Sequence, residues 1–442
     1  MVIIVYKETD MTKKIFTLAL VFFIMTAVFS KTQENTDAFL RLTVDDAVKY
    51  ALENNVSVKK SQLALNLKKR AKNSSWNAVS PTLNLSGTFN DDLEKETYST
   101  GISGTAAISL SPSLFSSVKS ALIAYDAGEL SYEDTKRKVE LNVRKSFYNI
   151  LYQKENLIAQ ERSLETAQQT YDSNLAKYNR GQLSELDLLN SQYNVESKKP
   201  VITSLKNTYT NDMASFKQVL GIGLSIHIEL DGDLDDVVKN IKLSEEILHG
   251  DIEALPSVKA AQNSVDAAKA KLLETRFSAY GPSLTASYSY GKTKEKNASD
   301  PTTTNKLSLG VKIPLDGWLP WSTGALSVAS QKESLEELKL QLEDEKTTAA
   351  INVRNSYNTI LQAQSQLETL EKNVSLMQRS YEMTRIAYNN GSKDLLTLQK
   401  AEDNLLTAKT SLQLQEFTLI SNVLTLESTL GLPFGTFSNV TN

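Results

Sequence analysis

Residue types that carry out enzyme chemistry are scarce in this sequence of 442 residues. Cysteine is absent, which excludes disulfides, thiol catalysis, thiolate metal sites and an acylated N-terminal cysteine. The two histidines, His227 and His249, lack metal-ligand spacing, so surface exposure or core packing is the ordinary role for each. Neither a nucleophile with its base nor a phosphate-binding loop is present. The sequence therefore predicts a protein that is not an enzyme and uses no metal or other cofactor.

Composition indicates long, regular elements instead. The chain has only nine prolines and 17 glycines, so few positions interrupt secondary structure and helix should dominate. Its formal net charge is -4, spread along the chain, and no nucleic-acid-binding motif is present. We therefore expect no nucleic-acid partner.

The N-terminus predicts export. Lys13 and Lys14 precede the mostly apolar run IFTLALVFFIMTAVFS, which ends in small residues as a secretory signal peptide does. We predict a signal peptide over 1–30, with cleavage after Ser30. A retained membrane anchor is the alternative, but the run is short for a membrane span.

Two segments recur at a constant offset of 210 residues. NVRKSFYNIL begins at 142 and NVRNSYNTIL at 352, and a Tyr-Asn-x-Gly tetrad begins at 178 and again at 388. The offset continues without insertion to Leu220-Gly221 and Leu430-Gly431. Such repetition predicts two copies of one structural unit. The predicted organisation is a first repeat over 31–221, a connector over 222–255, a second repeat over 256–431 and a tail over 432–442.

Each repeat has the pattern of long coiled-coil helices. Ile150, Leu157, Leu164, Tyr171 and Tyr178 recur every seven residues, and the second repeat has the same strip. The tetrad glycines favour left-handed helix termini, so each long helix should turn back on itself there. The predicted helices are 56–80, 113–179 and 184–220 in the first repeat, and 257–280, about 320–389 and 394–430 in the second. The predicted turns are 180–183 and 390–393.

Four segments alternate between apolar and polar residues and predict strands. They lie near 82–91 and 104–112 in the first repeat, and near 283–291 and 305–313 in the second. Strands with one apolar and one polar face fit the wall of a membrane β-barrel, although a small sheet covering a helix is the alternative. Large aromatic residues near the helix-to-strand junctions favour the membrane interpretation, because such side chains prefer the membrane interface. These predicted interface residues are Trp76, Phe115, Trp318 and Trp321.

Four strands cannot close a barrel by themselves. Open sheet edges are not tolerated in lipid, so several copies of the chain must pool their strands. Three copies give twelve strands, and the residues alone also permit dimers or tetramers. The predicted fold class is mainly α, with a long coiled-coil α-helical barrel and a membrane β-barrel part.

Together, the signal peptide, the tandem duplication, the paired strands and the heptad helices broken at Y-x-x-G resemble the TolC family of outer-membrane efflux proteins. The resemblance implies a homotrimeric channel-tunnel in outer-membrane lipid that extends into the periplasm. Its implied partners are a periplasmic adaptor and an inner-membrane pump of the RND, ABC or MFS type. Small molecules, metals and proteins secreted by a type I system are all cargoes of this family, and the sequence does not select among them.

The resemblance also implies a periplasmic gate. Asp187 matches the acidic residue six positions after the first tip glycine, whereas Tyr388 and Lys393 match a tyrosine and a basic residue beside the second. A Tyr–Asp hydrogen bond and a Lys–Asp ion pair would hold the two hairpins together in a closed state. The alternative is that Tyr388 only ends a heptad strip and Asp187 is a solvated charge. The implied adaptor-facing tips are Arg180, Gly181, Gln182, Leu183, Asn390 and Gly391.

A secreted trimeric coiled-coil adhesin is the alternative function. Such a protein would also be exported and rich in heptads. It would not need the strand, strand and helix order to occur twice, so the export channel is favoured.

Overall fold

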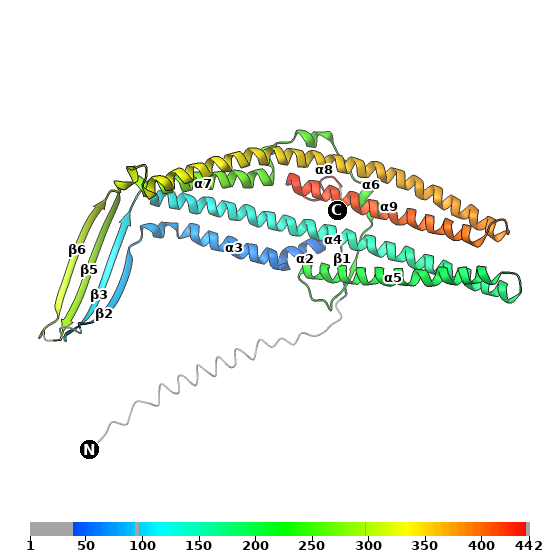
Figure 1. Ribbon diagram of the computed structural model, residues 1–442, viewed down its shortest axis with the longest axis horizontal. Helices are drawn as coiled ribbons and strands as arrows, with labels where there is room; N and C mark the ends of the chain where they lie inside the picture. Colours follow the sequence, from blue (N-terminus) through cyan, green and yellow to red (C-terminus); the bar gives the residue numbers. More distant parts are fainter. Residues whose placement is uncertain (1–38, 93–96, 297, 439–442) are drawn as a thin grey trace, which may run out of the picture.

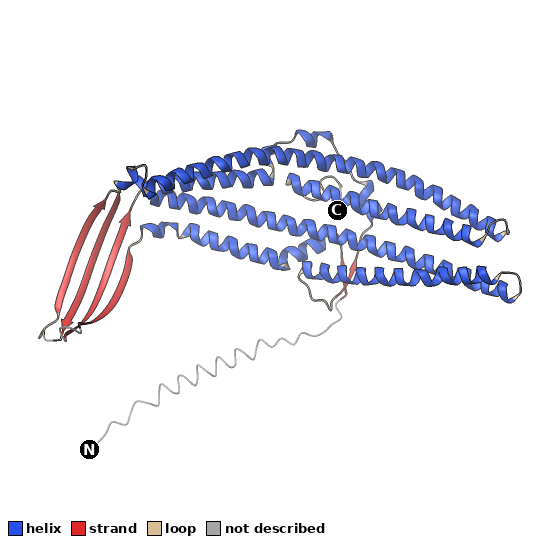
Figure 2. Ribbon diagram, viewed as in Figure 1, coloured by secondary structure: helices blue, strands red, loops and turns tan. Residues whose placement is uncertain are grey.

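The computed structural model describes residues 39–92, 97–296 and 298–438. It is an elongated molecule with a four-stranded sheet at one end and two helical hairpins at the other (Figure 1). Strands and helices are segregated along the molecule, except for a small strand pair near its middle (Figure 2). The predicted signal peptide, residues 1–30, lies outside the described residues.

The two repeats have matching helices. The long helices α4 (Ser113–Asn179) and α8 (Thr323–Asn389) have 67 residues each. The return helices α5 (Glu185–Leu220) and α9 (Leu395–Leu430) have 36 residues each. At about 1.5 Å per residue, each long helix spans roughly 100 Å. All four boundaries keep the sequence offset, so the tandem duplication is also a duplication of structure.

Shorter helices pack along the part of each long helix that the return helix does not cover. They are α2 (Val44–Asn54) and α3 (Val56–Asn73) in the first repeat and α7 (Pro256–Tyr280) in the second. The helix predicted over 56–80 ends at Asn73 in the structure, because the 3-10 helix η1 (Ser75–Val79) follows α3. Asn55 separates α2 from α3 and caps α3, and its side-chain nitrogen donates to the Val219 carbonyl at 2.7 Å. The end of α5 therefore meets the start of α3, and together they line α4.

The sheet joins the two repeats. It contains β2 (Thr82–Asp92), β3 (Thr97–Leu110), β5 (Ser283–Glu295) and β6 (Thr302–Lys312) in the order β2-β3-β5-β6, all antiparallel. The pairing of β3 with β5 is the contact between repeats. β3 begins well before the predicted start near 104, because Thr97 continues the ladder opposite Asp92. Its first residues are mostly Thr, Ser and Gly, which lack the apolar alternation used for the prediction.

The connector folds against the middle of the helical rod. It contributes β4 (His227–Leu230), which pairs in parallel with β1 (Phe39–Leu42), and the short helix α6 (Leu234–Lys239). Two 3-10 helices follow, η2 (Glu245–His249) and η3 (Ile252–Ala254). The sequence predicts a connector here but not its elements, because each is too short to show a period.

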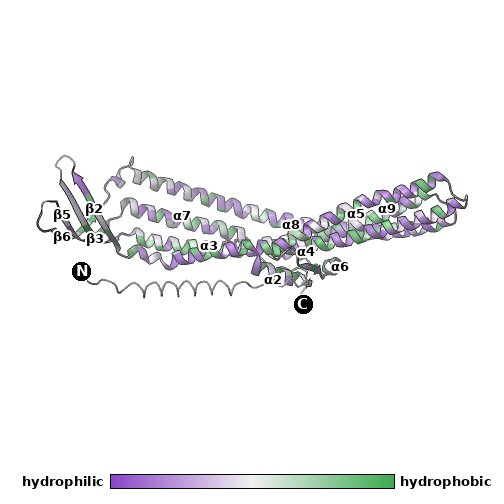
Figure 3. Ribbon diagram, turned by 90° about the horizontal axis from the view of Figure 1, so that it is seen from below, coloured by the Kyte–Doolittle hydropathy of each residue, from purple (hydrophilic) through white to green (hydrophobic). Residues whose placement is uncertain are grey.

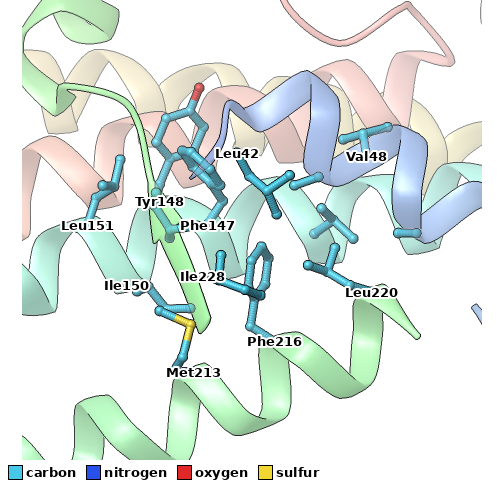
Figure 4. Packing of buried hydrophobic residues seen from close by; sticks show 14 of the residues in the cluster. Leu42, Val48, Phe147, Tyr148, Ile150, Leu151, Met213, Phe216, Leu220 and Ile228 are labelled. Carbon is cyan, nitrogen blue, oxygen red and sulfur yellow. The ribbon is translucent and has the colours of Figure 1, made fainter. Parts of the chain in front are cut away.

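Two apolar cores hold these elements together. The first lies where α2, β1 and β4 pack on α4 and α5, around the buried rings of Phe147 and Phe216, whose centroids are 6.4 Å apart (Figure 4). The second follows α7, α8 and α9, with Val265, Ile360 and Leu426 among its buried residues. Elsewhere hydrophobic and hydrophilic residues alternate along the helices (Figure 3). The rod is therefore held by narrow strips rather than by one broad core.

Glycines terminate all four long and return helices in the left-handed region. Gly181 and Gly391 both have φ of 72°, and a Cβ added at either would meet nothing within 4 Å. Gly221 has φ of 73°, but a Cβ there would lie 2.7 Å from the Asn54 carbonyl oxygen. Gly221 is therefore needed both for its backbone angle and for the close approach of α5 to α2.

This difference predicts unequal costs of alanine substitution. Gly181→Ala and Gly391→Ala should each destabilise the fold by about 1–2 kcal/mol, from the backbone angle alone. Gly221→Ala should cost at least about 1 kcal/mol more, because neighbouring atoms must move. Thermal unfolding of the purified variants measures the costs, with Gly223→Ala as the control. Equal losses at Gly181 and Gly221 would contradict the close-approach argument.

Candidate functional site

One face of the sheet is apolar and exposed along its length. Leu83, Ala106, Tyr288 and Leu307 are directly paired across all four strands, so they share a face. Leu83 is 78% exposed and Leu307 is 70% exposed. An apolar face of this kind, left uncovered by the chain's own helices, is the surface that a membrane wall turns toward lipid.

The opposite face is polar. The adjacent row pairs Thr82, Ala107, Ser287 and Ser308, and Lys306 lies on the same side of β6. Side chains alternate in direction along a strand, so these residues point away from the apolar face. The alternation predicted from sequence is therefore preserved across four strands.

The predicted interface aromatics lie where the sheet meets the helices. Trp76 is in η1, Phe115 is in the first turn of α4, and Trp318 ends the 3-10 helix η4 (Asp316–Trp318), with Trp321 shortly after it. Their exposed fractions are 63%, 83%, 69% and 75% respectively. The Tyr280 ring lies against Trp318 at 5.4 Å between centroids. The four aromatic side chains thus gather where the sheet meets the helices, and their contact with a membrane boundary stays a prediction.

The sheet and the helices both have open edges. Within the described residues β2 pairs only with β3, and β6 pairs only with β5. In the helical part α4 packs against α3, α5, α7 and α9, and α8 packs against α7 and α9, so α3, α5 and α8 form the edges. These edge helices expose apolar side chains at near-heptad spacing. They are Val56, Leu63 and Leu67 on α3, Leu186, Leu189 and Tyr193 on α5, and Leu376, Met383 and Ile386 on α8.

The hairpin tips have the same geometry in both repeats. In the first, Arg180 follows α4, Gly181 reverses the chain, and the Gln182 amide donates to the Lys177 carbonyl at 2.9 Å. The half-buried Leu183 leads into α5. In the second, Asn390 and Gly391 take the places of Arg180 and Gly181, and the Ser392 amide donates to the Ala387 carbonyl at 2.8 Å. Both are Schellman turns.

The three predicted gate residues make different contacts within one protomer. The Tyr388 hydroxyl donates to the Asn174 side-chain oxygen at 3.1 Å, and Asn174 is only 1% exposed. The Asp187 carboxylate accepts from the Ser184 hydroxyl at 2.7 Å and so completes the cap of α5. Lys393 is exposed in the second turn, directly before the residue that caps α9. Within the described protomer Tyr388 thus bonds to Asn174, and not to Asp187 as the resemblance implies.

Asp187 nevertheless acts on Tyr388 through its charge. Burial raises the pKa of the Tyr388 hydroxyl, the bond to Asn174 lowers it, and the Asp187 carboxylate raises it again. The Lys177 ammonium lies 5.4 Å from the centre of the Tyr388 ring. The Asn174 side-chain oxygen on α4 is therefore the acceptor of the Tyr388 hydroxyl, and Asp187 affects Tyr388 through its charge alone.

A second polar link between the repeats was missed by sequence reasoning. The Lys198 ammonium on α5 lies 3.0 Å from the Asp403 carboxylate on α9, with the Lys198 side chain 11% exposed. Beside it, the Ser163 hydroxyl on α4 donates to Glu402 at 3.1 Å. Burial raises the pKa of Glu402, and the Lys198 charge lowers it. A signal was present, since Lys198 lies three residues after the buried Val195 and four before the buried Ile202, on the helical strip that packs inward.

An acidic group lies further along the rod, near α6. Burial raises the pKa of Glu416 on α9 to about 7, and the nearby carboxylates of Glu155, Asp233, Asp235 and Glu371 add to this rise. The pKa of Glu155 is also raised, chiefly by burial. The ionised form of Glu416 is therefore disfavoured in the folded protein.

Glu416 makes stability depend on pH in a defined direction. Because its pKa rises from 4.5 when unfolded to about 7 when folded, the stability that it contributes is present below pH 4.5 and is lost as pH rises through 7. Glu416→Gln should therefore raise the thermal midpoint at about pH 8 and change it little at low pH. Glu368→Gln is the control, since Lys372 lowers the pKa of that carboxyl. Equal midpoints for wild type and Glu416→Gln at high pH would contradict this assignment.

Among the described residues, no group of three or more His, Cys, Asp or Glu side chains could hold a metal ion. None of the helices there is both long and apolar enough to cross a membrane.

The chain matches known proteins in both sequence and fold. Residues 47–222 and 252–432 match the family model described as outer membrane efflux protein. The structure of CusC is similar with a TM-score of 0.74 and 18% identity, covering 88% of this chain and 92% of CusC. No curated protein gives a significant sequence match.

Two further solved structures share the fold. The CmeC outer membrane channel of Campylobacter jejuni gives a TM-score of 0.73 at 16% identity, covering 90% of this chain and 87% of that one. The open-state MtrE outer membrane channel of Neisseria gonorrhoeae gives 0.71 at 18% identity, covering 88% and 89%. Because the family model covers both repeats, the chain belongs to the outer membrane efflux protein family, whose members are outer-membrane transport channels extending into the periplasm rather than enzymes.

Proposed function

We propose that three copies of the chain form a channel-tunnel that serves as the exit duct of a tripartite export system. The open edges are the observation that carries this proposal, since β2 and β6 each have one partner strand in the described protomer. Pairing the free edge of β6 with β2 of the next copy satisfies the backbone groups that lipid would leave unpaired. Three copies would supply a barrel of twelve strands.

The helices support the same assembly. The exposed apolar side chains of α8 lie on one edge of the helical layer, and those of α3 and α5 lie on the other. Packing α8 of one copy against α3 and α5 of the next would bury both strips. The helical layer would then close into a tunnel that continues the barrel across the periplasm.

In this assembly the hairpin tips form the periplasmic mouth. A periplasmic adaptor would dock on the tips around Gly181 and Gly391, and an inner-membrane pump of the RND, ABC or MFS type would supply the energy. Drug or other small-molecule efflux and type I protein secretion both fit a duct of this kind. Identifying the pump and adaptor genes that neighbour this gene would distinguish small-molecule efflux from type I protein secretion.

Oligomer state and pore activity test the proposal together. Outer-membrane extracts should contain an SDS-resistant trimer that dissociates on heating, and the purified trimer should conduct ions in a planar bilayer. A secreted trimeric adhesin, the alternative, would give a trimer without conductance. A monomer without pore activity would exclude the channel altogether.

We further propose that Asp187, Tyr388 and Lys393 hold the mouth closed. Tyr388→Phe removes the hydroxyl that donates to Asn174, and Asp187→Ala removes the carboxylate charge that acts on Tyr388. The double variant should weaken the contact between the two hairpins by about 1–3 kcal/mol. Single-channel conductance and antibiotic sensitivity should both rise. Tyr178→Phe, at the equivalent position of the first repeat, is the control. Unchanged conductance in the double variant would remove these residues from the gate.

A further inference from the structure

An apolar hollow of about 520 Å³ lies where the sheet meets the helices. One wall is a row of paired side chains, Leu110 on β3, Leu284 on β5 and Val311 on β6. This row lies on the same face as the exposed residues Tyr288 and Leu307, because it is separated from them along the strands by an even number of residues. The hollow therefore opens on the apolar face of the sheet, at the end nearest the helices.

Helical segments supply the other walls. Phe115 and Val118 come from the first turns of α4, and Trp76 and Val79 come from η1. Phe115 is 83% exposed and Trp76 is 63% exposed, so two large aromatic side chains border the hollow without being covered. Together with the sheet wall, these side chains enclose an apolar space that suits a hydrocarbon chain.

The hollow lies mostly within one protomer. Its sheet wall spans the two middle strands β3 and β5 and reaches the edge strand β6 at Val311. A second copy that pairs with the free edge of β6 therefore borders the hollow on one side, while the walls on β3, β5 and α4 belong to a single protomer. Its volume lies within the range of roughly 300–1,000 Å³ that is usual for small-molecule sites.

Basic side chains lie on the helical side of the hollow. Lys72 is in the last turn of α3, four residues before Trp76, and the exposed Lys119 is four residues after Phe115 on α4. Neither lysine lines the hollow, but each lies four residues along the chain from a residue that does, and its flexible side chain can extend in that direction. The Lys72 ammonium lies over the Tyr125 ring at 4.1 Å from its centre, so Lys72 must change rotamer to meet a phosphate. Lysine at this level suits a phosphate, while the hollow suits hydrocarbon.

We propose that the hollow binds one acyl chain of a phospholipid from the periplasmic leaflet, with the lipid phosphate near Lys72 and Lys119. The occupant is amphipathic because the site is, with an apolar pocket continuous with the lipid-facing wall and a basic pair on the side of the helices. This inference rests on the proposed placement of the sheet in the membrane. It adds a specific lipid site for each protomer at the junction of barrel and tunnel.

Retention of lipid through purification is the first test. The detergent-solubilised oligomer is exchanged extensively into lipid-free detergent, and bound phospholipid is counted by native mass spectrometry and phosphorus analysis. One phospholipid per protomer is expected in the wild type and in Ala286→Phe, which adds an aromatic ring to the same sheet face outside the hollow. Ala78→Phe adds the same ring inside the hollow and should weaken retention about tenfold, the equivalent of losing contact with two CH₂ groups.

A fluorescence measurement does not depend on the filled variant folding. The chain has three tryptophans, so Trp318→Phe with Trp321→Phe leaves Trp76 as the reporter in the hollow wall. A phospholipid brominated on its acyl chains, added at one equivalent per protomer, should quench Trp76 strongly. The matched variant that retains Trp321 alone should be quenched much less. Lys72→Gln with Lys119→Gln should raise the lipid concentration needed for half-maximal quenching.

Several outcomes would overturn the proposal. They are a wild-type protein that retains no phospholipid, equal retention by Ala78→Phe and Ala286→Phe, and equal quenching of the two tryptophan reporters. Quenching by a brominated fatty acid but not by the phospholipid would also exclude it, because the phosphate would then have no role. These measurements use solubilised protein and are independent of pore activity. A conducting trimer without bound lipid would therefore exclude the proposed lipid site and still support the proposed channel.

Discussion

Leu307→Arg is expected to prevent stable insertion of the protein into the outer membrane. Leu307 is 70% exposed and lies in the row of directly paired apolar residues that crosses all four strands. An arginine at the lipid-facing midplane of a barrel costs about 2–4 kcal/mol, and a trimer would carry this cost three times. The heat-resistant trimer should be lost from outer-membrane extracts.

The neighbouring residue provides the matched control. Ser308 pairs with Ser287 and points to the opposite, polar face, where Lys306 is already tolerated two residues away. Ser308→Arg should therefore leave the trimer in the membrane and change only the conductance or the ion selectivity of the pore. Equal loss of trimer in the two variants would mean that the apolar face is not the one that contacts lipid.

Lys198→Met is expected to shift the tunnel toward an open state. The substitution removes the cation that lies 3.0 Å from Asp403 and that partly offsets the effect of burial on the pKa of Glu402. Hydrogen bonds to charged groups contribute about 1.5–3 kcal/mol, so the contact between α5 and α9 should weaken by at least about tenfold in equilibrium terms. Mean single-channel conductance and sensitivity of cells to large antibiotics should rise.

Lys199→Met separates this effect from a general loss of charge. Lys199 is the next residue on α5, and its ion pair is with Glu196 of the same helix, with the two side chains 51% and 58% exposed. An exposed pair of this kind contributes under about 1 kcal/mol and does not link the repeats. Exchanging the charges as Lys198→Asp with Asp403→Lys should restore part of the wild-type closure. If Lys198→Met and Lys199→Met behave alike, the pair between α5 and α9 does not position the hairpins.

The long elements could be predicted because their signals accumulate over many residues. The heptad strip from Ile150 to Tyr178 predicts a helix over 113–179, and α4 covers Ser113–Asn179. The duplication then transfers the same boundaries to α8 and α9. Short elements contain too few residues for a periodic pattern to accumulate. For this reason β4 and α6 within the connector were not predicted, and β3 was predicted to begin too late.

Polar contacts between helices were harder to predict because they depend on which faces meet. The resemblance pairs Tyr388 with Asp187, but Asn174 on α4 is the acceptor in the described protomer. Asn174 lies seven residues after the buried Ala167, so a polar residue on a buried strip marked the position without naming its partner. Lys198 is a second case of the same kind. Periodicity in the sequence locates the buried face of one helix. Which polar side chain meets another across that face depends on how the neighbouring helices pack.

Cross-linking between the free strand edges tests the central claim of a three-copy barrel most directly. The chain has no cysteine, so a pair of cysteines introduced on β2 and β6 gives no background. Suitable pairs combine Leu85→Cys on β2 with Asn305→Cys, Leu307→Cys or Leu309→Cys on β6. Oxidation in intact outer membranes should yield, for at least one pair, covalent dimers and trimers on denaturing gels and no larger species. Monomers alone for every pair, or a ladder extending beyond trimers, would contradict the account.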